Sequence, residues 1–147
     1  MRSPSLEEAA LWLAQAAADL DAARRFADAV PFAACFYAQQ AAEKALKAVF
    51  VVHGAEFPWI HSVGRLLREL AQEYPQLRRF YDGAAILDGY YTGTRYPSPA
   101  LGIAPSDSFT PANAADAVAL AAPVVEECRR IYDQLARTST EPEQEEI

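Results

Sequence analysis

Apolar residues recur every three or four positions along most of this chain, which is the spacing of an amphipathic α-helix. The strongest such segment, residues 35–52, reads CFYAQQAAEKALKAVFVV and contains neither Gly nor Pro. Most of its residues are strong helix formers, so a helix is expected here in any surroundings. Small residues form one stripe along it: Ala38, Ala41, Ala42, Ala45, Val49 and Val52. Because small side chains allow a neighbouring helix to approach closely, the stripe predicts a place at the centre of a bundle.

The same spacing predicts further helices on both sides of this segment. Their expected ranges are 6–29, 61–75, 76–90 and 110–137. Ser5 should cap the first, with Glu8 as its capping-box partner, and Pro75 should end the helix that starts at residue 61. Pro123 lies inside the last helix and should kink it, because proline lacks a backbone donor.

The remaining segments are expected to be irregular. Residues 56–60 form a loop that should press Trp59 against the bundle, and 91–110 form a long loop rich in Pro and Gly. No alternation of the kind seen in strands occurs. The chain is therefore predicted to be all-α, an antiparallel up-and-down four-helix bundle with a short additional helix. Residues 1–137 form a single domain, and 138–147 are expected to be a disordered acidic tail.

Composition limits the functional classes. The 147 residues are 52% apolar, enough for one sizeable core. The formal net charge is −7, but Glu141, Glu143, Glu145 and Glu146 all lie in the tail, which leaves the body mildly acidic. Such a body argues against general nucleic-acid binding, which requires a basic face.

The chain offers no candidate membrane span, because its apolar runs are short. Glu7 and Glu8 interrupt the region where a secretion signal needs an apolar core, which argues against export. Cys35 and Cys128 are both expected on helices among apolar residues, as buried free thiols, and a reducing cytoplasmic location is therefore expected.

A polar stripe lies along the segment 35–52, between Phe36 and Phe50. It consists of Gln40, Glu43 and Lys47, one helical turn apart. One interpretation is a solvated face in which Glu43 and Lys47 form an ordinary i,i+4 pair. The other is a functional site on the central helix.

Four motifs in this order resemble the HEPN domain family. They are residues 37–48 (YAQQAAEKALKA), an upstream Trp12-Leu13 followed by 18–20 (ADL), His61-Ser62-Val63 with the leucines after it, and residues 90–97 (YYTGTRYP). The resemblance extends from about Leu6 to Leu135. It implies the same all-α bundle, and a homodimer formed through helices. The small-residue stripe is compatible with such a dimer interface and equally with a place in the core of one chain.

The best candidate site joins the central helix to the turn at residues 90–97. A guanidinium beside phenol rings suits a phosphate and a stacked base, and the polar stripe could add donors. The candidate ligand-binding residues are Arg95, Tyr96, Tyr91, Lys47, Gln40, Glu43 and Lys44. The alternative is structural: Arg95 pairs with Glu43 inside the bundle and the tyrosines fill gaps in the core.

The resemblance also bears on catalysis. Many HEPN domains are ribonucleases that use an Arg followed, after four to six residues, by a His. Arg95 matches the Arg, but Ala100, Leu101 and Gly102 stand where the His belongs, and no His follows His61. His61 itself is expected to cap or pack against a helix. We therefore expect no catalytic residue, no ribonuclease activity, and no metal or cofactor.

Without the Arg–His pair, the resemblance implies the non-catalytic branch of the family. The predicted function is a nucleotide-binding or partner-binding module, the companion of a minimal nucleotidyltransferase. The alternative is a divergent ribonuclease toxin of a toxin–antitoxin pair, with another group in place of the missing His.

Overall fold

The computed structural model describes residues 3–53 and 59–140. Its helices are α1 (Pro4–Phe26), α2 (Pro31–Val52), α3 (Val63–Leu70), the 3-10 helix η1 (Pro75–Phe80), α4 (Tyr81–Gly93), α5 (Pro105–Ser108) and α6 (Pro111–Thr140). Within these ranges the backbone forms no strand, only an isolated bridge between Ser98 and Ile103. The predicted all-α bundle is confirmed. No helix in the described parts of the chain is long and apolar enough to cross a bilayer.

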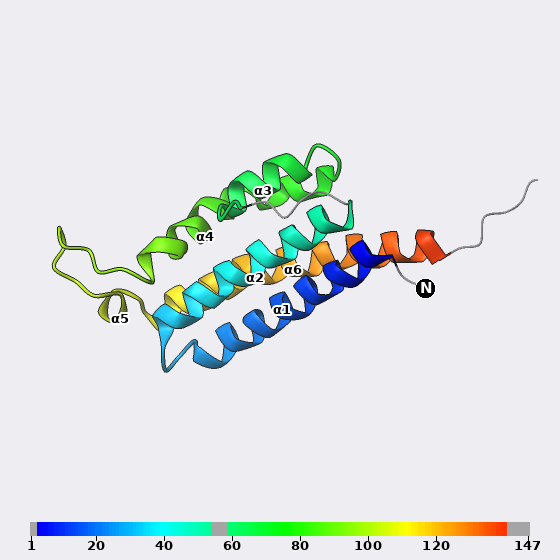
Figure 1. Cartoon of the computed structure of the whole chain (residues 1–147). Coiled ribbons are helices and arrows are strands. Elements are labelled where there is room, and N and C mark those ends of the chain that lie inside the picture. The colour runs from blue at the N-terminus through cyan, green and yellow to red at the C-terminus, as the bar shows by residue number, and fades with distance from the viewer. Residues whose placement is uncertain (1–2, 54–58, 141–147) are drawn as a thin grey trace, which may run out of the picture.

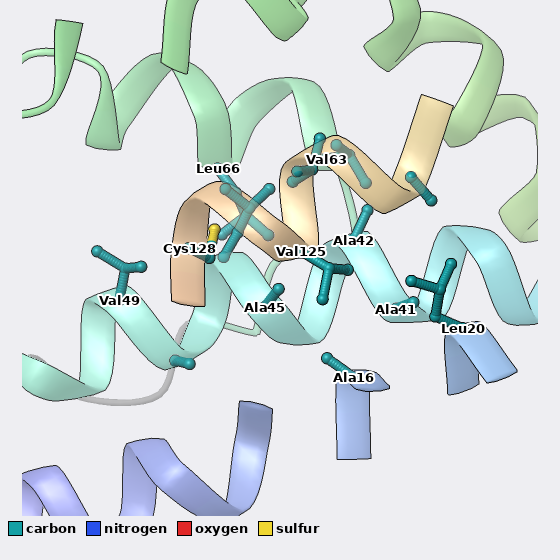
Figure 2. Packing of buried hydrophobic residues seen from close by; sticks show 14 of the residues in the cluster. Ala16, Leu20, Ala41, Ala42, Ala45, Val49, Val63, Leu66, Val125 and Cys128 are labelled. Carbon is teal, nitrogen blue, oxygen red and sulfur yellow. The ribbon is translucent and has the colours of Figure 1, made fainter. Parts of the chain in front are cut away.

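Helix α2 lies in the middle of the molecule. The long helices α1 and α6 lie beside it, and the α3–α4 segment covers another side (Figure 1). Figure 2 shows Ala41, Ala42 and Ala45 of α2 among buried side chains of α1, α3 and α6. The small-residue stripe is fully buried except for the half-buried Val52. The stripe is therefore intramolecular core, one of the two alternatives that the sequence left open, and is not a surface for a second copy.

Several helix ends differ from the predicted ones. The N-cap of α1 is Ser3, whose Oγ accepts from the backbone N of Leu6, and Pro4 takes the first helical position. Proline suits that position because its missing donor is not needed there. The expected cap at Ser5 is wrong for this reason, since Ser5 already lies inside the helix. Helix α1 ends at Phe26, shortly before Pro31 opens α2.

The segment after residue 61 is divided more finely than expected. Ser62 caps α3 through a bond from the backbone N of Arg65, but α3 ends at Leu70. Pro75 does not end a helix; it starts η1, which leads directly into α4. A proline at the start of a 3-10 turn keeps its fixed φ and loses no required bond.

The long segment after α4 is mostly irregular, as predicted. Helix α4 continues to Gly93, so Tyr91 lies in its last turn, and α5 occupies only four residues. Gly102 has φ +63°, a left-handed conformation that glycine adopts without steric cost. Its backbone N donates to the carbonyl of Ser98 at 2.9 Å, which closes a tight turn.

Helix α6 continues through Pro123 and reaches Thr140, three residues beyond the end expected at Arg137. The hydroxyls of Thr138 and Ser139 bond back to carbonyls of the preceding turn, which satisfies both groups within the helix. The expected kink at Pro123 stays a prediction. The rest of the acidic tail, 141–147, lies outside the described residues.

Both thiols are free and buried, as expected. Burial raises the pKa of Cys35 to about 11, with a smaller contribution from the charge of Asp116. Burial also raises the pKa of Cys128, which lies in the core on α6.

Candidate functional site

A hollow of about 240 Å³ opens beside the polar stripe of α2, and we name it the cationic hollow. Its walls are Trp12, Phe36, Gln40, Glu43, Lys44, Lys47, His61, Tyr91 and Arg95. Three of these side chains are Lys or Arg and one is a carboxylate. The hollow brings together every candidate residue named above except Tyr96, whose ring lies 5.2 Å from the Arg95 guanidinium carbon.

Arg95 is positioned by Tyr91, one helical turn before it. Its Nε donates to the Tyr91 carbonyl at 2.7 Å, and its guanidinium carbon lies 4.0 Å from the centroid of the Tyr91 ring. No carboxylate in the described part of the chain pairs with Arg95. The structural alternative, in which Arg95 pairs with Glu43 inside the bundle, is therefore not what the structure shows. Tyr96 is 59% exposed, so it does not fill a gap in the core either.

Glu43 is almost completely buried and has several polar neighbours. Its Oε2 accepts from Gln40 at 3.3 Å, and its Oε1 lies 2.9 Å from Nδ1 of His61 and 3.6 Å from Nζ of Lys47. Lys47 is also buried, at 2% exposure. Of the two interpretations of the polar stripe, the first is right about the i,i+4 pair and wrong about the solvated face, because Glu43 and Lys47 are both buried.

Burial lowers the pKa of Lys47, while the charge of Glu43 and its hydrogen bond to Lys47 act in the opposite direction. Desolvation penalises a charged ammonium, and a neighbouring carboxylate offsets part of that penalty. Glu43 is thus the group that favours the charged form of Lys47 in the wall of the hollow.

His61 was not among the predicted site residues, yet it lies in the wall with Arg95. Its ring stacks on that of Tyr91, with centroids 4.9 Å apart and planes 10° from parallel. Nδ1 faces Glu43, and Nε2 makes no hydrogen bond within the described residues. The side chain is 45% exposed. Ser62, not His61, caps the helix, so the cap expected of His61 is wrong, whereas its packing is confirmed.

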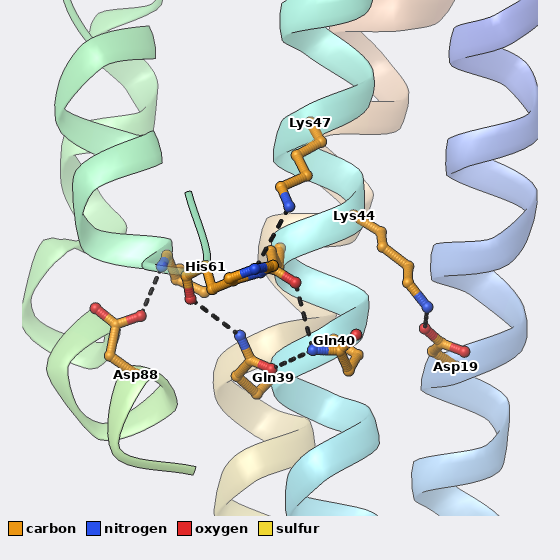
Figure 3. A network of polar contacts seen from close by, with 9 residues as sticks. Asp19, Gln39, Gln40, Lys44, Lys47, His61 and Asp88 are labelled. Atoms are coloured by element: carbon orange, nitrogen blue, oxygen red, sulfur yellow. Dashed lines mark hydrogen bonds and ion pairs between the residues drawn. The ribbon is translucent and has the colours of Figure 1, made fainter. Parts of the chain in front are cut away.

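Hydrogen bonds hold the residues before α3 against α2. The buried Gln39 donates from Nε2 to the His61 carbonyl at 3.5 Å, and its Oε1 accepts from Gln40 at 2.7 Å (Figure 3). These amides form a chain that ends at the Glu43 carboxylate. The position of His61 is therefore set by α2, although the residue belongs to another segment.

Lys44 is held away from the other cations. Its Nζ lies 2.6 Å from Oδ2 of Asp19, a buried carboxylate on α1 that also accepts from Gln15 (Figure 3). Lys44 therefore ties α1 to α2 at the edge of the hollow. Of the predicted cations, Arg95 is the best placed to meet a ligand, because Lys47 is buried beside Glu43 and contributes its charge from inside the wall.

A second hollow of about 340 Å³ adjoins the first, and we name it the aromatic hollow. Its walls are Trp59, Ile60, His61, Ser62, Arg65, Asp88 and Tyr91. His61 and Tyr91 belong to both hollows. Trp59 is 85% exposed, so the expectation that it packs against the bundle is wrong.

Asp88 of α4 holds the base of the aromatic hollow in place. Its carboxylate accepts from Ser62 Oγ at 2.9 Å and from the backbone N of Val63 and Gly64 at 2.6 and 3.2 Å. A carboxylate at this end of α3 is favoured by the helix dipole. A Cβ on Gly64 would lie 3.2 Å from Asp88 Oδ2, which explains a glycine at this close approach.

Two larger hollows, of about 610 and 400 Å³, lie along α1 and α6. Leu13 and Arg129 belong to both, and neither contains a predicted ligand-binding residue. Their volume alone would favour them over the cationic hollow as ligand sites. Their walls, however, are chiefly Ala, Leu and ion-paired side chains such as Arg129 with Asp133, whereas ligand sites need a few converging polar groups. The cationic hollow meets that requirement better.

The chain is similar to known helical proteins over almost its whole length. The HEPN domain family model matches residues 9–131. Among solved structures, TT1696 from Thermus thermophilus has 34% identity and a TM-score of 0.75, covering 83% of this chain and 96% of that one. ST0689, an archaeal HEPN homologue, has 28% identity and a TM-score of 0.68, covering 90% and 99%. No curated protein matches. The family match includes every residue of the cationic and aromatic hollows.

Proposed function

The chain belongs to the HEPN domain family, and from this premise we propose that the cationic hollow binds the phosphate groups of a nucleotide. One observation carries the proposal. Arg95 is held by Tyr91 without a carboxylate partner among the described residues, and it shares the hollow with the ammonium of Lys47. A planar guanidinium binds phosphate through two parallel hydrogen bonds, and the ring beside it limits its freedom before binding.

Charge supports an anionic ligand. The protein is acidic overall, but cations outnumber carboxylates in the walls of this hollow. The Glu43 carboxylate is already engaged by Gln40, His61 and Lys47, which reduces its repulsion of a phosphate. A hollow in which one sign of charge predominates focuses its field and attracts ligands of the opposite charge.

We also propose that the protein acts as the companion of a minimal nucleotidyltransferase and has no catalytic role of its own. The support is the resemblance together with the missing His after Arg95. The homodimer expected from the resemblance would require an outer surface of the bundle, because the small-residue stripe of α2 is used inside it.

The test is calorimetric titration of ATP and GTP, with and without magnesium, into wild type and Arg95→Ala. Loss of a charge-assisted hydrogen bond should weaken binding roughly ten- to a hundredfold. Arg25→Ala is the matched control, because Arg25 is exposed on α1 and pairs only with Asp21 among the described residues. Both variants should still melt cooperatively. No heat from either nucleotide with wild type, or equal binding by Arg95→Ala, would refute the proposal.

A second candidate function has one specific observation in its favour. His61, held by a buried carboxylate at Nδ1, lies in the same hollow as Arg95, although it precedes Arg95 in the sequence. A His oriented in this way can transfer protons through its other nitrogen. We rank ribonuclease activity second because the Arg–His spacing of the family's ribonucleases is absent.

RNA cleavage distinguishes the two candidates. We expect purified wild type to leave total RNA and a structured RNA such as tRNA intact over hours. If specific cleavage appears, and both His61→Ala and Arg95→Ala abolish it while Arg25→Ala does not, the ribonuclease is the correct function. A contaminating nuclease would remain in all preparations, so the loss of cleavage in His61→Ala and Arg95→Ala excludes it. Retained cleavage by Arg25→Ala shows that the loss is specific to the hollow.

A further inference from the structure

We infer that the cationic and aromatic hollows are two parts of one nucleotide site, with the phosphates beside Arg95 and the base against Trp59. This inference rests on the proposed function and adds the location of the base. Neither Trp59 nor the residues around Asp88 belong to the site predicted from the sequence.

The hollows share a wall. The stacked rings of His61 and Tyr91 line both, so a ligand leaving the cationic hollow passes over this pair into the aromatic one. Tyr91 contacts the Arg95 guanidinium and the His61 ring, which connects the residues of the two hollows. The shared wall is rigid, because Glu43 and Gln39 hold the side chain and backbone of His61.

A whole nucleotide needs the volume of both hollows. Pockets that enclose small ligands usually measure about 300–1,000 Å³. The cationic hollow is below this range at about 240 Å³, so it suits phosphates but not a whole nucleotide. The aromatic hollow adds about 340 Å³ next to it.

The chemistry of the walls sets the orientation. Arg65 and Asp88 bring one charge of each sign to the aromatic hollow, so it has no net attraction for phosphate. It offers instead the indole of Trp59, 85% exposed, beside the shared rings. Exposed aromatic faces stack on bases with little preference for sequence. The phosphates therefore belong in the cationic hollow and the base in the aromatic one.

The two tryptophans of the chain allow a direct test. Trp12 lines the cationic hollow and Trp59 the aromatic one. In Trp12→Phe the remaining fluorescence comes from Trp59, and in Trp59→Phe it comes from Trp12. Three ligands are titrated into each: ATP, inorganic triphosphate and adenosine. We expect triphosphate to change the emission of Trp12 alone, adenosine that of Trp59 alone, and ATP that of both.

Affinities give a second readout. Trp59→Ala should weaken ATP binding about 5- to 100-fold, toward the affinity of triphosphate, and leave triphosphate binding unchanged. Arg95→Ala should weaken both ligands. Leu11→Ala is the control for removing an exposed apolar side chain, since Leu11 is 71% exposed and lines neither hollow.

The failures of the two proposals are distinguishable. If triphosphate binds as tightly as ATP and Trp59→Ala changes nothing, the two-part site is refuted while phosphate binding stands. The two-part site is equally refuted if ATP alters only the emission of Trp12. If wild type binds neither ATP nor triphosphate, the proposed function and this inference are both refuted.

Discussion

At the scale of single residues, Glu43 links the stability of this protein to its candidate site. It is buried beside Lys47, and it also faces His61 and Gln40. Removing two charges from water is costly, and the cost is offset only when the charges pair and their remaining hydrogen bonds are satisfied. Glu43 supplies that pairing inside the wall of the cationic hollow.

Glu43→Ala should therefore lower the free energy of unfolding by about 3–5 kcal/mol, because it removes the carboxylate beside a buried ammonium. Urea unfolding measures this directly. Replacing both charges together, as Glu43→Leu with Lys47→Met, should restore much of the loss. Asp21→Ala, which breaks an exposed pair with Arg25, should cost about 1 kcal/mol or less. A loss for Glu43→Ala as small as that of Asp21→Ala would contradict the account.

The loss in Glu43→Ala should also depend on pH. Burial already lowers the pKa of Lys47, and removing Glu43 takes away an opposing contribution. As pH rises, the folded variant then releases its proton before the unfolded chain does. The unfolded state binds more protons in that window, so stability increases with pH. The destabilisation of Glu43→Ala relative to wild type, measured by urea unfolding, should be smaller at about pH 10 than at about pH 7.

At the scale of helices, the sequence was informative wherever a local pattern decides the structure. The central place of α2 followed from its small-residue stripe, and α6 starts at Pro111, one residue after the start of the predicted range 110–137. The start of α1 and the end of α3 did not follow, because proline can open a helix as well as stop one. Pro4 and Pro75 both open helical turns here. Local propensity alone does not distinguish these roles.

In the candidate site, too, local patterns predicted some residues and missed one that depends on a contact between segments. Residues on one helix face, such as Gln40, Glu43 and Lys47, could be grouped from their spacing, and Arg95 from its motif. His61 lies in the candidate site because its Nδ1 contacts Glu43, a residue 18 positions earlier in the chain. A search for a His downstream of Arg95 misses it. The available signal was Glu43 in the polar stripe together with His61 at the start of the helix predicted over 61–75.

At the scale of the whole molecule, the long helices and the α3–α4 segment pack against the single helix α2, which argues for one cooperative unit. Cys35 on α2 and Cys128 on α6 report on two different helices of that unit, and both thiols are buried with raised pKa values. The thiolate is the reactive form, so the native protein should react very slowly with a disulfide reagent at about pH 8.

Labelling should therefore follow global unfolding at both thiols. Cys35→Ala and Cys128→Ala each leave one reporter, and the opening free energy from each labelling rate should equal that from urea unfolding of the same variant. Cys35 lies near Tyr90, close to the irregular segment after α4, and Cys128 lies in the core of α6. In Cys128→Ala the reporter is Cys35, and in Cys35→Ala it is Cys128. If Cys35 reacts faster than Cys128→Ala unfolds, while Cys128 reacts only as fast as Cys35→Ala unfolds, the start of α2 opens on its own. The polar stripe would then lie on a helix that opens apart from the bundle, which would contradict the rigid placement of His61 by Gln39 and Glu43 in the wall shared by the two hollows.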